Sequence, residues 1–283
     1  MTDEKIIELR NLAAQIRIKT IRCMQSAGGG HIGGAMSIAD VLAVLYGDIM
    51  RYDVKTPCWK ERDRLVVSKG HSGPAVYAAL SLSGFFPEEM LYTLNKGGTQ
   101  LPSHCDRNKT PGIDMTTGSL GQGVSAACGM AYALKLSGNP ARVFVILGDG
   151  ELQEGQVWEA VQFAAQNKLS NLTILVDNNK AQLDGKLEDI CRPYDLSGKF
   201  RAFGLESFAV TGYDVKEIHD GITRCFDKNV TCALILETHK GIGCKFAEEA
   251  LFNHFMNFGD SEADEAEKEI LHRLELGIVR KGA

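Results

Sequence analysis

Residues 143–179, VFVILGDGELQEGQVWEAVQFAAQNKLSNLTILVDNN, contain two short apolar runs separated by a helical pattern. The runs, 143–147 and 172–176, are rich in β-branched residues and lack strict alternation, which is typical of parallel strands buried on both faces. Apolar side chains recur at helical spacing between them, at Trp158, Val161, Ala165 and Leu169. The stretch therefore predicts a strand, a helix and a second strand.

Two polar side chains follow these predicted strands, Asp149 after the first and Asn179 after the second. A right-handed crossover makes the strands parallel, so we expect both side chains at the carboxyl edge of one sheet. Alone, either GDG or DNN would be read as a turn. Together they offer hard oxygen ligands suited to Mg²⁺, with Ca²⁺ or Mn²⁺ as substitutes. Because Mg²⁺ commonly completes its shell with phosphates and water, the pair predicts a phosphorylated ligand.

The composition is that of an ordinary soluble globular protein. The chain has 283 residues, 44% of them hydrophobic and 24% charged, and a formal net charge of −5. No cluster of Lys and Arg is long enough to follow a nucleic-acid backbone, so nucleic acid is not an expected partner. The N-terminus is acidic and amphipathic rather than signal-like, and we expect no apolar run long enough for a membrane span. These features predict a cytoplasmic protein that does not bind a membrane.

Eight cysteines are spread along the chain without a C-x-x-C pair. This spacing supports neither a zinc site nor a disulfide framework, and it indicates reduced thiols. No linker rich in Pro, Ser or Gly interrupts the pattern, so we predict one domain over residues 1–283.

The rest of the chain alternates strand and helix patterns. The first helix places Ile6, Leu9, Ala13 and Ile16 on one stripe. A second helix is expected from Ser37, where SIAD resembles a capping box. Residues 261–277 are charged and predict a solvent-facing helix. The alternation predicts a doubly wound, mostly parallel α/β sheet flanked by helices.

Several loops at the predicted carboxyl edge carry polar or glycine-rich sequence. The segment 118–123, GSLGQG, precedes a helix, where backbone N–H groups receive phosphate oxygens. Gly28, Gly30 and Gly33 match G-x-G-x-x-G but follow a helix instead of a strand, which argues against a dinucleotide site, and no Walker lysine motif is present. A diphosphate held with Mg²⁺ agrees with these loops.

Four histidines are candidate functional residues. A single histidine is more often structural, but three of these four lie in glycine-rich or turn-like loops, where an exposed imidazole can donate to phosphates or act as acid or base near pH 7. As a set they favour a functional site. They are His31, His71, His104 and His254.

These motifs together resemble the diphosphate-binding domain of thiamine-diphosphate enzymes, and specifically the N-terminal portion of transketolase. They occur in the family's order over most of the chain. The matching strings are SAGGGHIGG (26–34), DRLVVSKGHS (63–72), LPSHCD (101–106), TTGSLGQG (116–123), GDGELQEG (148–155) and DNN through LDG (177–185).

The resemblance implies a role for each matching residue. Asp149, Asn179 and the Ala181 carbonyl correspond to the Mg²⁺ ligands, and His71 to the histidine that contacts the diphosphate. The implied catalytic residues are His31, His104, Glu154 and His254. The implied cofactor contacts, besides His71, Asn179 and His254, are Gly118, Ser119, Leu120, Gly148, Gly150 and Glu151. His254 is the least regular match, since the family has Gly after this His and the chain has NHFMNF, so His239 in ETHKG is an alternative.

The resemblance also implies a partner. Transketolases continue into a pyrimidine-binding domain with the glutamate that activates the cofactor, and into a third domain, neither of which is found in this sequence. We therefore expect the N-terminal subunit of a split transketolase, in an α2β2 assembly with a C-terminal partner subunit, and active only in that complex. It would use thiamine diphosphate and Mg²⁺ to transfer a two-carbon ketol unit from a ketose phosphate to an aldose.

Other functions stay open at this point. One is an α-type subunit of another thiamine-diphosphate enzyme, such as a 2-oxo-acid dehydrogenase or a deoxyxylulose-phosphate synthase. Another is a non-catalytic regulatory module that retains the fold. The sugar is also open among pentose phosphates, apiose-derived ketoses and sulfonated ketoses.

Overall fold

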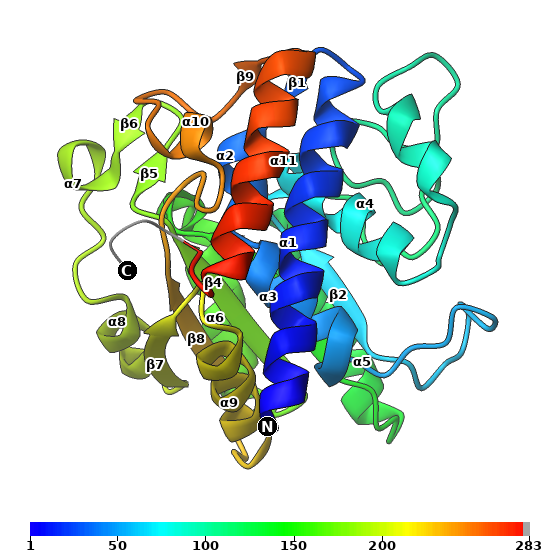
Figure 1. The fold of residues 1–283 in the computed structure, drawn as a ribbon. Helices are drawn as coiled ribbons and strands as arrows, with labels where there is room; N and C mark the ends of the chain where they lie inside the picture. Colours follow the sequence, from blue (N-terminus) through cyan, green and yellow to red (C-terminus); the bar gives the residue numbers. More distant parts are fainter. Residues whose placement is uncertain (280–283) are drawn as a thin grey trace.

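A five-stranded parallel sheet lies at the centre of the chain in the computed structural model, which describes residues 1–279 (Figure 1). The strand order is β2-β3-β4-β8-β7, and all four neighbouring pairs are parallel. This confirms the predicted fold class. The strands are β2 (Arg64–Val67), β3 (Val143–Gly148), β4 (Leu172–Asn178), β7 (Glu206–Thr211) and β8 (Cys232–Glu237).

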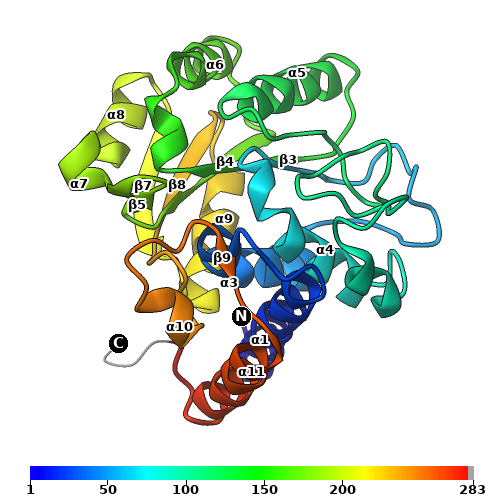
Figure 2. The same ribbon diagram turned by 90° about the horizontal axis from the view of Figure 1, so that it is seen from above.

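Helices cover both faces of this sheet (Figure 2). One face carries α5 (Gln122–Leu136), α6 (Gly155–Gln166) and α8 (Leu196–Ala202). The other carries α1 (Asp3–Gln25), α3 (Ala39–Val44), α4 (Gly73–Leu82), α9 (Val215–Phe226) and α11 (Asp260–Glu275). The shorter elements are β1 (Gly29–Gly30), α2 (Ile32–Met36), η1 (Leu45–Ile49), η2 (Gly70–Ser72), η3 (Glu88–Thr93), η4 (Gly150–Gln153), β5 (Ala181–Gln182), β6 (Gly185–Lys186), α7 (Leu187–Ile190), α10 (Lys245–Glu248) and β9 (Met256–Asn257).

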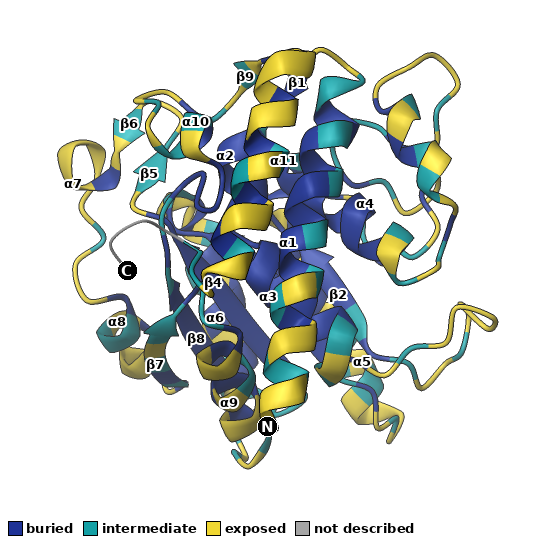
Figure 3. Cartoon of the chain, in the orientation of Figure 1, coloured by how far each residue is buried: buried dark blue, intermediate teal, exposed yellow. Residues whose placement is uncertain are grey.

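The strands divide their side chains between two apolar cores. Along β3, Val143, Val145 and Leu147 pack with α5 and α6, whereas Phe144 and Ile146 pack with the α1 side. Both sets are fully buried. Figure 3 shows the central strands of the sheet in dark blue, the colour of buried residues. The sequence of β3 lacks polar alternation because neither face of the strand meets water.

The strand, helix and strand predicted around GDG and DNN are confirmed as β3, α6 and β4, with Gly148 paired to Asp177 in the register. The predicted buried stripe of the helix is only partly right. Its buried residues are Val157, Ala160, Val161 and Ala164, while Trp158 is half-buried. Trp158 faces α8 instead of the sheet, with its ring 5.3 Å from Phe200 and 5.5 Å from Phe203.

The predicted helix start at Ser37 is wrong. Helix α3 begins at Ala39, Ile38 precedes it, and no side chain of the described residues caps it. The Ser37 hydroxyl donates instead to Asp177 in β4 (2.6 Å), and Asp40 forms a buried ion pair with Arg17. Both side chains of the apparent capping box have tertiary partners, which local sequence does not reveal.

Helix α11 is solvent-facing on one side only. Ala263, Ala266 and Ile270 are buried, and the helix lies along α1 (Figure 1). On the outer side, Arg22 of α1 pairs with Asp264 (2.7 Å). The prediction of a wholly solvent-facing helix is therefore wrong for the face that covers α1.

One segment is long and apolar enough to span a membrane, contrary to the expectation from the sequence. It is Ile32–Ile49, with a mean hydropathy of 1.5. It is divided among α2, α3 and η1 and is 83% buried inside the protein. Its apolar character is therefore accounted for by the core beneath α1.

The cysteines are all free, six of them buried and two exposed. Burial raises the pKa of the Cys23 and Cys244 thiols to about 12, so these two act as apolar core residues.

Candidate active site

A cavity of about 380 Å³ opens at the carboxyl edge of the sheet. It is lined by every site residue inferred from the motifs except Ser119. The lining comprises His31, Gly34, Lys69, His71, His104, Gly118, Leu120, Gly148, Asp149, Gly150, Glu151, Gln153, Glu154, Asn179, Ala181, Gln182, Leu183, Lys240 and His254. Loops from widely separated parts of the chain thus meet where parallel strands end.

Asp149 and Asn179 lie at this edge because β3 and β4 are adjacent. Asp149 is 2% exposed, and within residues 1–279 only backbone N–H groups donate to its carboxylate: Gly150 at 2.8 Å and Lys180 at 2.6 Å. Burial, then the nearby Asp177 carboxylate, raises the pKa of Asp149 to about 7. A buried carboxylate in such surroundings favours a bound cation.

The side chain of Asn179 is oriented by Asp177. The Asn179 amide nitrogen donates to Asp177 Oδ2 at 2.7 Å. Asp177 is fully buried and accepts at the same oxygen from Ser37 Oγ and from the buried Lys69 ammonium. The amide oxygen of Asn179 accepts from the N–H of Ala181 at 3.2 Å, and as the acceptor end of the amide it is the group that can also bind a cation.

These residues fit a hard cation but do not complete its shell. Within residues 1–279, no three His, Cys, Asp or Glu side chains are grouped so that they could hold a metal ion. A cation here would therefore depend on Asp149, Asn179, a backbone carbonyl such as that of Ala181, and oxygens of a ligand.

The glycine-rich segment before α5 forms the adjoining wall. Gly121 precedes the helix with φ 81°, and Gly118 has φ 158°. A Cβ on Gly118 would lie 3.2 Å from His104. Positive φ and close approach together favour glycine at Gly118.

Glu151 supports this wall with its carboxylate. One oxygen accepts from Ser68 Oγ and from the N–H of Gly121 (2.8 Å), and the other from the N–H of Gly148 (3.1 Å). Both oxygens are therefore used inside the protein, so its geometry favours support of the two glycine segments over direct ligand contact. Its role as a cofactor contact stays a prediction.

The four predicted histidines form one cluster. Ring centroids of His31 lie 5.5 Å from His71, 5.4 Å from His104 and 5.3 Å from His254. His71 and His254 are 4.8 Å apart. The four come from positions up to 223 residues apart in the sequence (254 − 31).

The cluster is uncharged near pH 7. Burial, then the Lys69 charge, lowers the pKa of His71 to about 2. Burial, then the Lys240 charge, lowers the pKa of His254 to about 4. The pKa values of His31 and His104 are also lowered, mainly by burial. Neutral imidazoles can each donate one hydrogen bond and accept another, which suits hydroxyl groups and proton transfer.

His254 and His239, the two alternatives from the sequence, lie in different cavities. His254 lines the histidine cavity, whereas His239 lines a neighbouring cavity of about 710 Å³. Glu154 is exposed at the cavity rim, before α6. Ser119 is exposed and outside the lining, so its role as a cofactor contact is not supported by its position.

Lys240 is a site residue that the sequence reasoning missed. It is 8% exposed, lines the cavity, and donates from Nζ to the carbonyl of Gln182 at 2.9 Å. Burial, then the charge of Lys69, lowers the pKa of Lys240 to about 8. The signal in the sequence is its place in ETHKG directly after an apolar strand, beside His239.

Comparisons with known proteins agree with this geometry. Residues 9–272 match the family described as transketolase, thiamine diphosphate binding domain. The chain is 47% identical to the 6-deoxy-6-sulfo-D-fructose transketolase subunit of Clostridium sp. (strain MSTE9), covering 89% of this chain and 92% of that one. It is 38% identical to an apulose-4-phosphate transketolase subunit of Actinobacillus succinogenes, covering 85% and 88%.

Full-length transketolases are matched over less than half of their length. Identity to the human enzyme is 36%, covering 96% of this chain and 43% of that protein. The solved transketolase of Campylobacter jejuni superposes with a TM-score of 0.88 at 29% identity, covering 95% of this chain and 43% of the other. The chain therefore belongs to the transketolase family, as a thiamine-diphosphate-binding N-terminal subunit of the split type.

Proposed function

We propose that this chain and a C-terminal transketolase subunit together use thiamine diphosphate and Mg²⁺ to transfer a two-carbon ketol unit from an anionic ketose to an aldose. The main support for binding of Mg²⁺ and thiamine diphosphate is the cavity itself. It places the buried Asp149 carboxylate, the oriented Asn179 amide and the Lys240 ammonium around one space. The oxygens of Asp149 and Asn179 suit Mg²⁺, and the Lys240 ammonium suits the phosphate oxygens. Together they match a diphosphate bound with Mg²⁺.

We assign each residue a role from its chemistry. Asp149, Asn179 and the Ala181 carbonyl hold Mg²⁺, while the Lys240 ammonium offsets diphosphate charge. Thiamine diphosphate, when bound, supplies the carbon nucleophile that accepts the two-carbon unit.

The neutral histidines His31, His104 and His254 hold the sugar hydroxyls and move protons at them. His71 contacts the diphosphate. Enclosure by the partner would exclude water from these groups.

The partner is proposed to cover the mouth of the cavity. Large apolar side chains are exposed there: Leu183 lines the cavity and is 60% exposed, and Phe255 is 50% exposed with its ring 5.1 Å from His31. Leu251, which lines the neighbouring cavity, is 74% exposed. Apolar residues gathered around a catalytic opening favour a protein interface. The assembly we propose is α2β2, with Glu154 at the subunit boundary.

The donor sugar is proposed from the named relatives. The more similar relative is named for 6-deoxy-6-sulfo-D-fructose, and the other for apulose-4-phosphate. Both names describe ketoses with an anionic end. We therefore propose an anionic ketose donor and place the sulfonated sugar first, ahead of apulose-4-phosphate and pentose phosphates.

The test is to co-express the chain with the neighbouring reading frame and copurify the products. The complex is assayed for ketol transfer with thiamine diphosphate and Mg²⁺, using the sulfonated ketose, apulose-4-phosphate and xylulose-5-phosphate as donors. We expect activity in the complex and none in either chain alone.

Three results would contradict parts of the proposal. A chain that stays alone excludes the two-component assembly. A stable complex that binds the cofactor but turns over none of these donors favours a regulatory module. Activity on 2-oxo acids identifies another thiamine-diphosphate enzyme.

A further inference from the structure

One buried asparagine connects three segments of the cavity wall. Asn253 is 7% exposed, and its amide nitrogen donates to the carbonyls of Lys240 (2.9 Å) and Ala247 (2.7 Å). Its own backbone carbonyl accepts from the N–H of Gly33 at 2.9 Å. Both protons of the amide nitrogen are therefore engaged.

Three of the segments that meet at Asn253 carry a residue of the proposed active site. Lys240 faces the cavity itself, His254 follows Asn253 directly, and Gly33 lies two residues after His31. Gly241 N–H donates to the Gly33 carbonyl at 3.0 Å and closes the triangle of contacts. The relative positions of two histidines and one lysine thus depend on contacts that meet at one residue. The side-chain amide of Asn253 binds the Lys240 and Ala247 carbonyls, and its backbone carbonyl binds Gly33.

The approach at Gly33 is close. A Cβ on Gly33 would lie 2.5 Å from the Asn253 carbonyl oxygen and 2.9 Å from its side-chain oxygen. The backbone of the glycine segment therefore rests directly against Asn253. A glycine is needed at 33 for this contact, independently of backbone flexibility.

Apolar packing contributes little to holding the segment of residues 251–255. Its large apolar residues Leu251, Phe252 and Phe255 are 74%, 64% and 50% exposed. Asn253 lies between them and is buried. The segment is therefore located by polar contacts, and Asn253 makes the contacts on the cavity side.

We propose that Asn253 is a positioning residue that sets His254 and Lys240 against His31 for ketol transfer. This inference rests on the proposed function, in which those three residues bind the sugar and the diphosphate. An amide suits the position because one nitrogen donates to two carbonyls; a carboxylate or a methyl group cannot do so.

The variant Asn253→Ala removes both donors and leaves two carbonyls without them. In the complex we expect kcat/KM to fall about 10-fold to 100-fold, because small displacements of reacting groups are costly in rate. Asn257→Ala is the matched control, since Asn257 is exposed and lies four residues further along the same segment. We expect the control to stay within about twofold of the parent, because an exposed side chain holds no group of the cavity.

A second readout uses the chain without partner or cofactor. The seven histidines are labelled at Cε1 with ¹³C, and the His254 signal is assigned by its loss in His254→Gln. In Asn253→Ala, the His254 signal should lose its ring-current shift from His31 and His71 and titrate at a higher pH. The Asn257→Ala control should leave the spectrum unchanged.

The two readouts separate failure of the positioning role from failure of the proposed function. If the parent complex has no ketol transfer, the proposed function fails while the histidine spectrum still tests the positioning. If the His254 signal of Asn253→Ala matches the parent, or kcat/KM changes less than twofold, the positioning role is excluded. Should Asn253→Ala not fold, Asn253→Ser keeps one hydroxyl donor and should show a smaller shift in the same direction; an unchanged signal there also overturns the proposal.

Discussion

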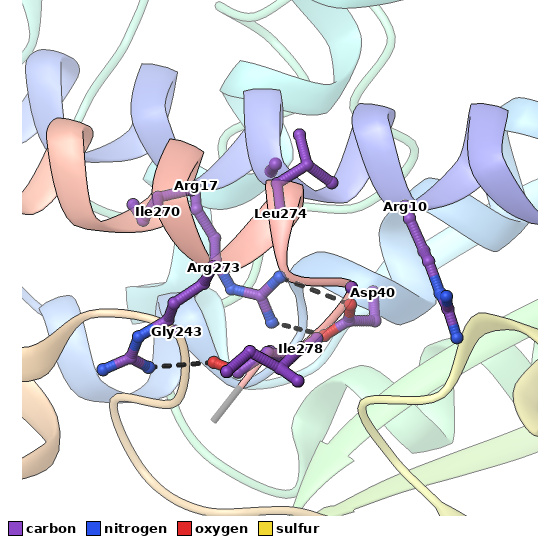
Figure 4. A pocket seen from close by; sticks show the side chains of 11 residues that line it. Arg10, Arg17, Asp40, Gly243, Ile270, Arg273, Leu274 and Ile278 are labelled. Atoms are coloured by element: carbon purple, nitrogen blue, oxygen red, sulfur yellow. Dashed lines mark hydrogen bonds and ion pairs between the residues drawn. The ribbon is translucent and has the colours of Figure 1, made fainter. Parts of the chain in front are cut away.

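Two buried polar regions of this molecule differ in how their charges are paired. Figure 4 shows the first, where Arg17 of α1 binds Asp40 of α3 and Arg273 of α11 lies close by. Arg273 pairs with Glu248 at 3.1 Å, and the space among these groups is about 40 Å³. The second is the cavity at the carboxyl edge, which is about 380 Å³ and contains the Asp149 carboxylate.

The difference separates structural from functional polar groups. In the first region each acid lies against an arginine, so burial is compensated inside the protein. In the second, across the part of the chain that the structure describes, only backbone N–H groups donate to the buried carboxylate of Asp149. A buried carboxylate that no side chain neutralises, beside an open cavity, indicates that a ligand or metal ion supplies the positive charge.

The largest expected effect is in the open cavity. Asp149→Ala removes the proposed charged metal ligand and should abolish Mg²⁺-dependent retention of thiamine diphosphate by the assembled complex. Cofactor content after gel filtration, with and without Mg²⁺, measures this. Unchanged content would exclude Asp149 as a metal ligand.

The next effect concerns the histidines. His31→Ala should lower turnover by about 10² to 10⁴-fold, the usual contribution of one positioned acid or base. Cofactor retention and unfolding temperature should stay near the parent values, because the ring faces the cavity. A loss of turnover below threefold would make His31 structural.

In the first region, around Arg17 and Asp40, a substitution should change the free energy of unfolding instead of activity. Asp40→Ala leaves the Arg17 guanidinium buried beside no acid and should lower the free energy of unfolding by about 3 to 5 kcal/mol. The control Asp264→Ala breaks the exposed pair with Arg22 and should cost under about 1 kcal/mol. Urea unfolding compares them; equal effects would contradict the contrast between the two regions.

The smallest effect is a pH dependence of stability. The pKa of His71 is about 2 in the folded chain, whereas an unfolded histidine titrates near 6.5. Between these values only the unfolded state binds this proton, so the contribution of His71 to stability falls as pH drops below about 6.5, by at most about 1.4 kcal/mol per pH unit. His71→Asn should reduce this slope between pH 5 and 6, about where the window lies. His272→Asn, which changes an exposed histidine on α11, serves as the control.

The predicted fold depended on patterns within short stretches. Residues 143–179 contain two strands and the helix that connects them, so their order and the edge occupied by Asp149 and Asn179 follow from local periodicity and the handedness of the crossover. The motif strings likewise identified the residues around the cavity and the family.

Contacts between distant segments were beyond reach of the sequence alone. It did not reveal that His254 rather than His239 joins the histidine cluster, that Ser37 binds Asp177 instead of capping a helix, or that Lys240 enters the site. Each outcome depends on which side chains meet after folding, and a hydrogen bond between residues 140 positions apart leaves no local pattern. Periodicity specifies elements and the sheet edge, whereas the partner of each polar group is decided only when the loops pack together.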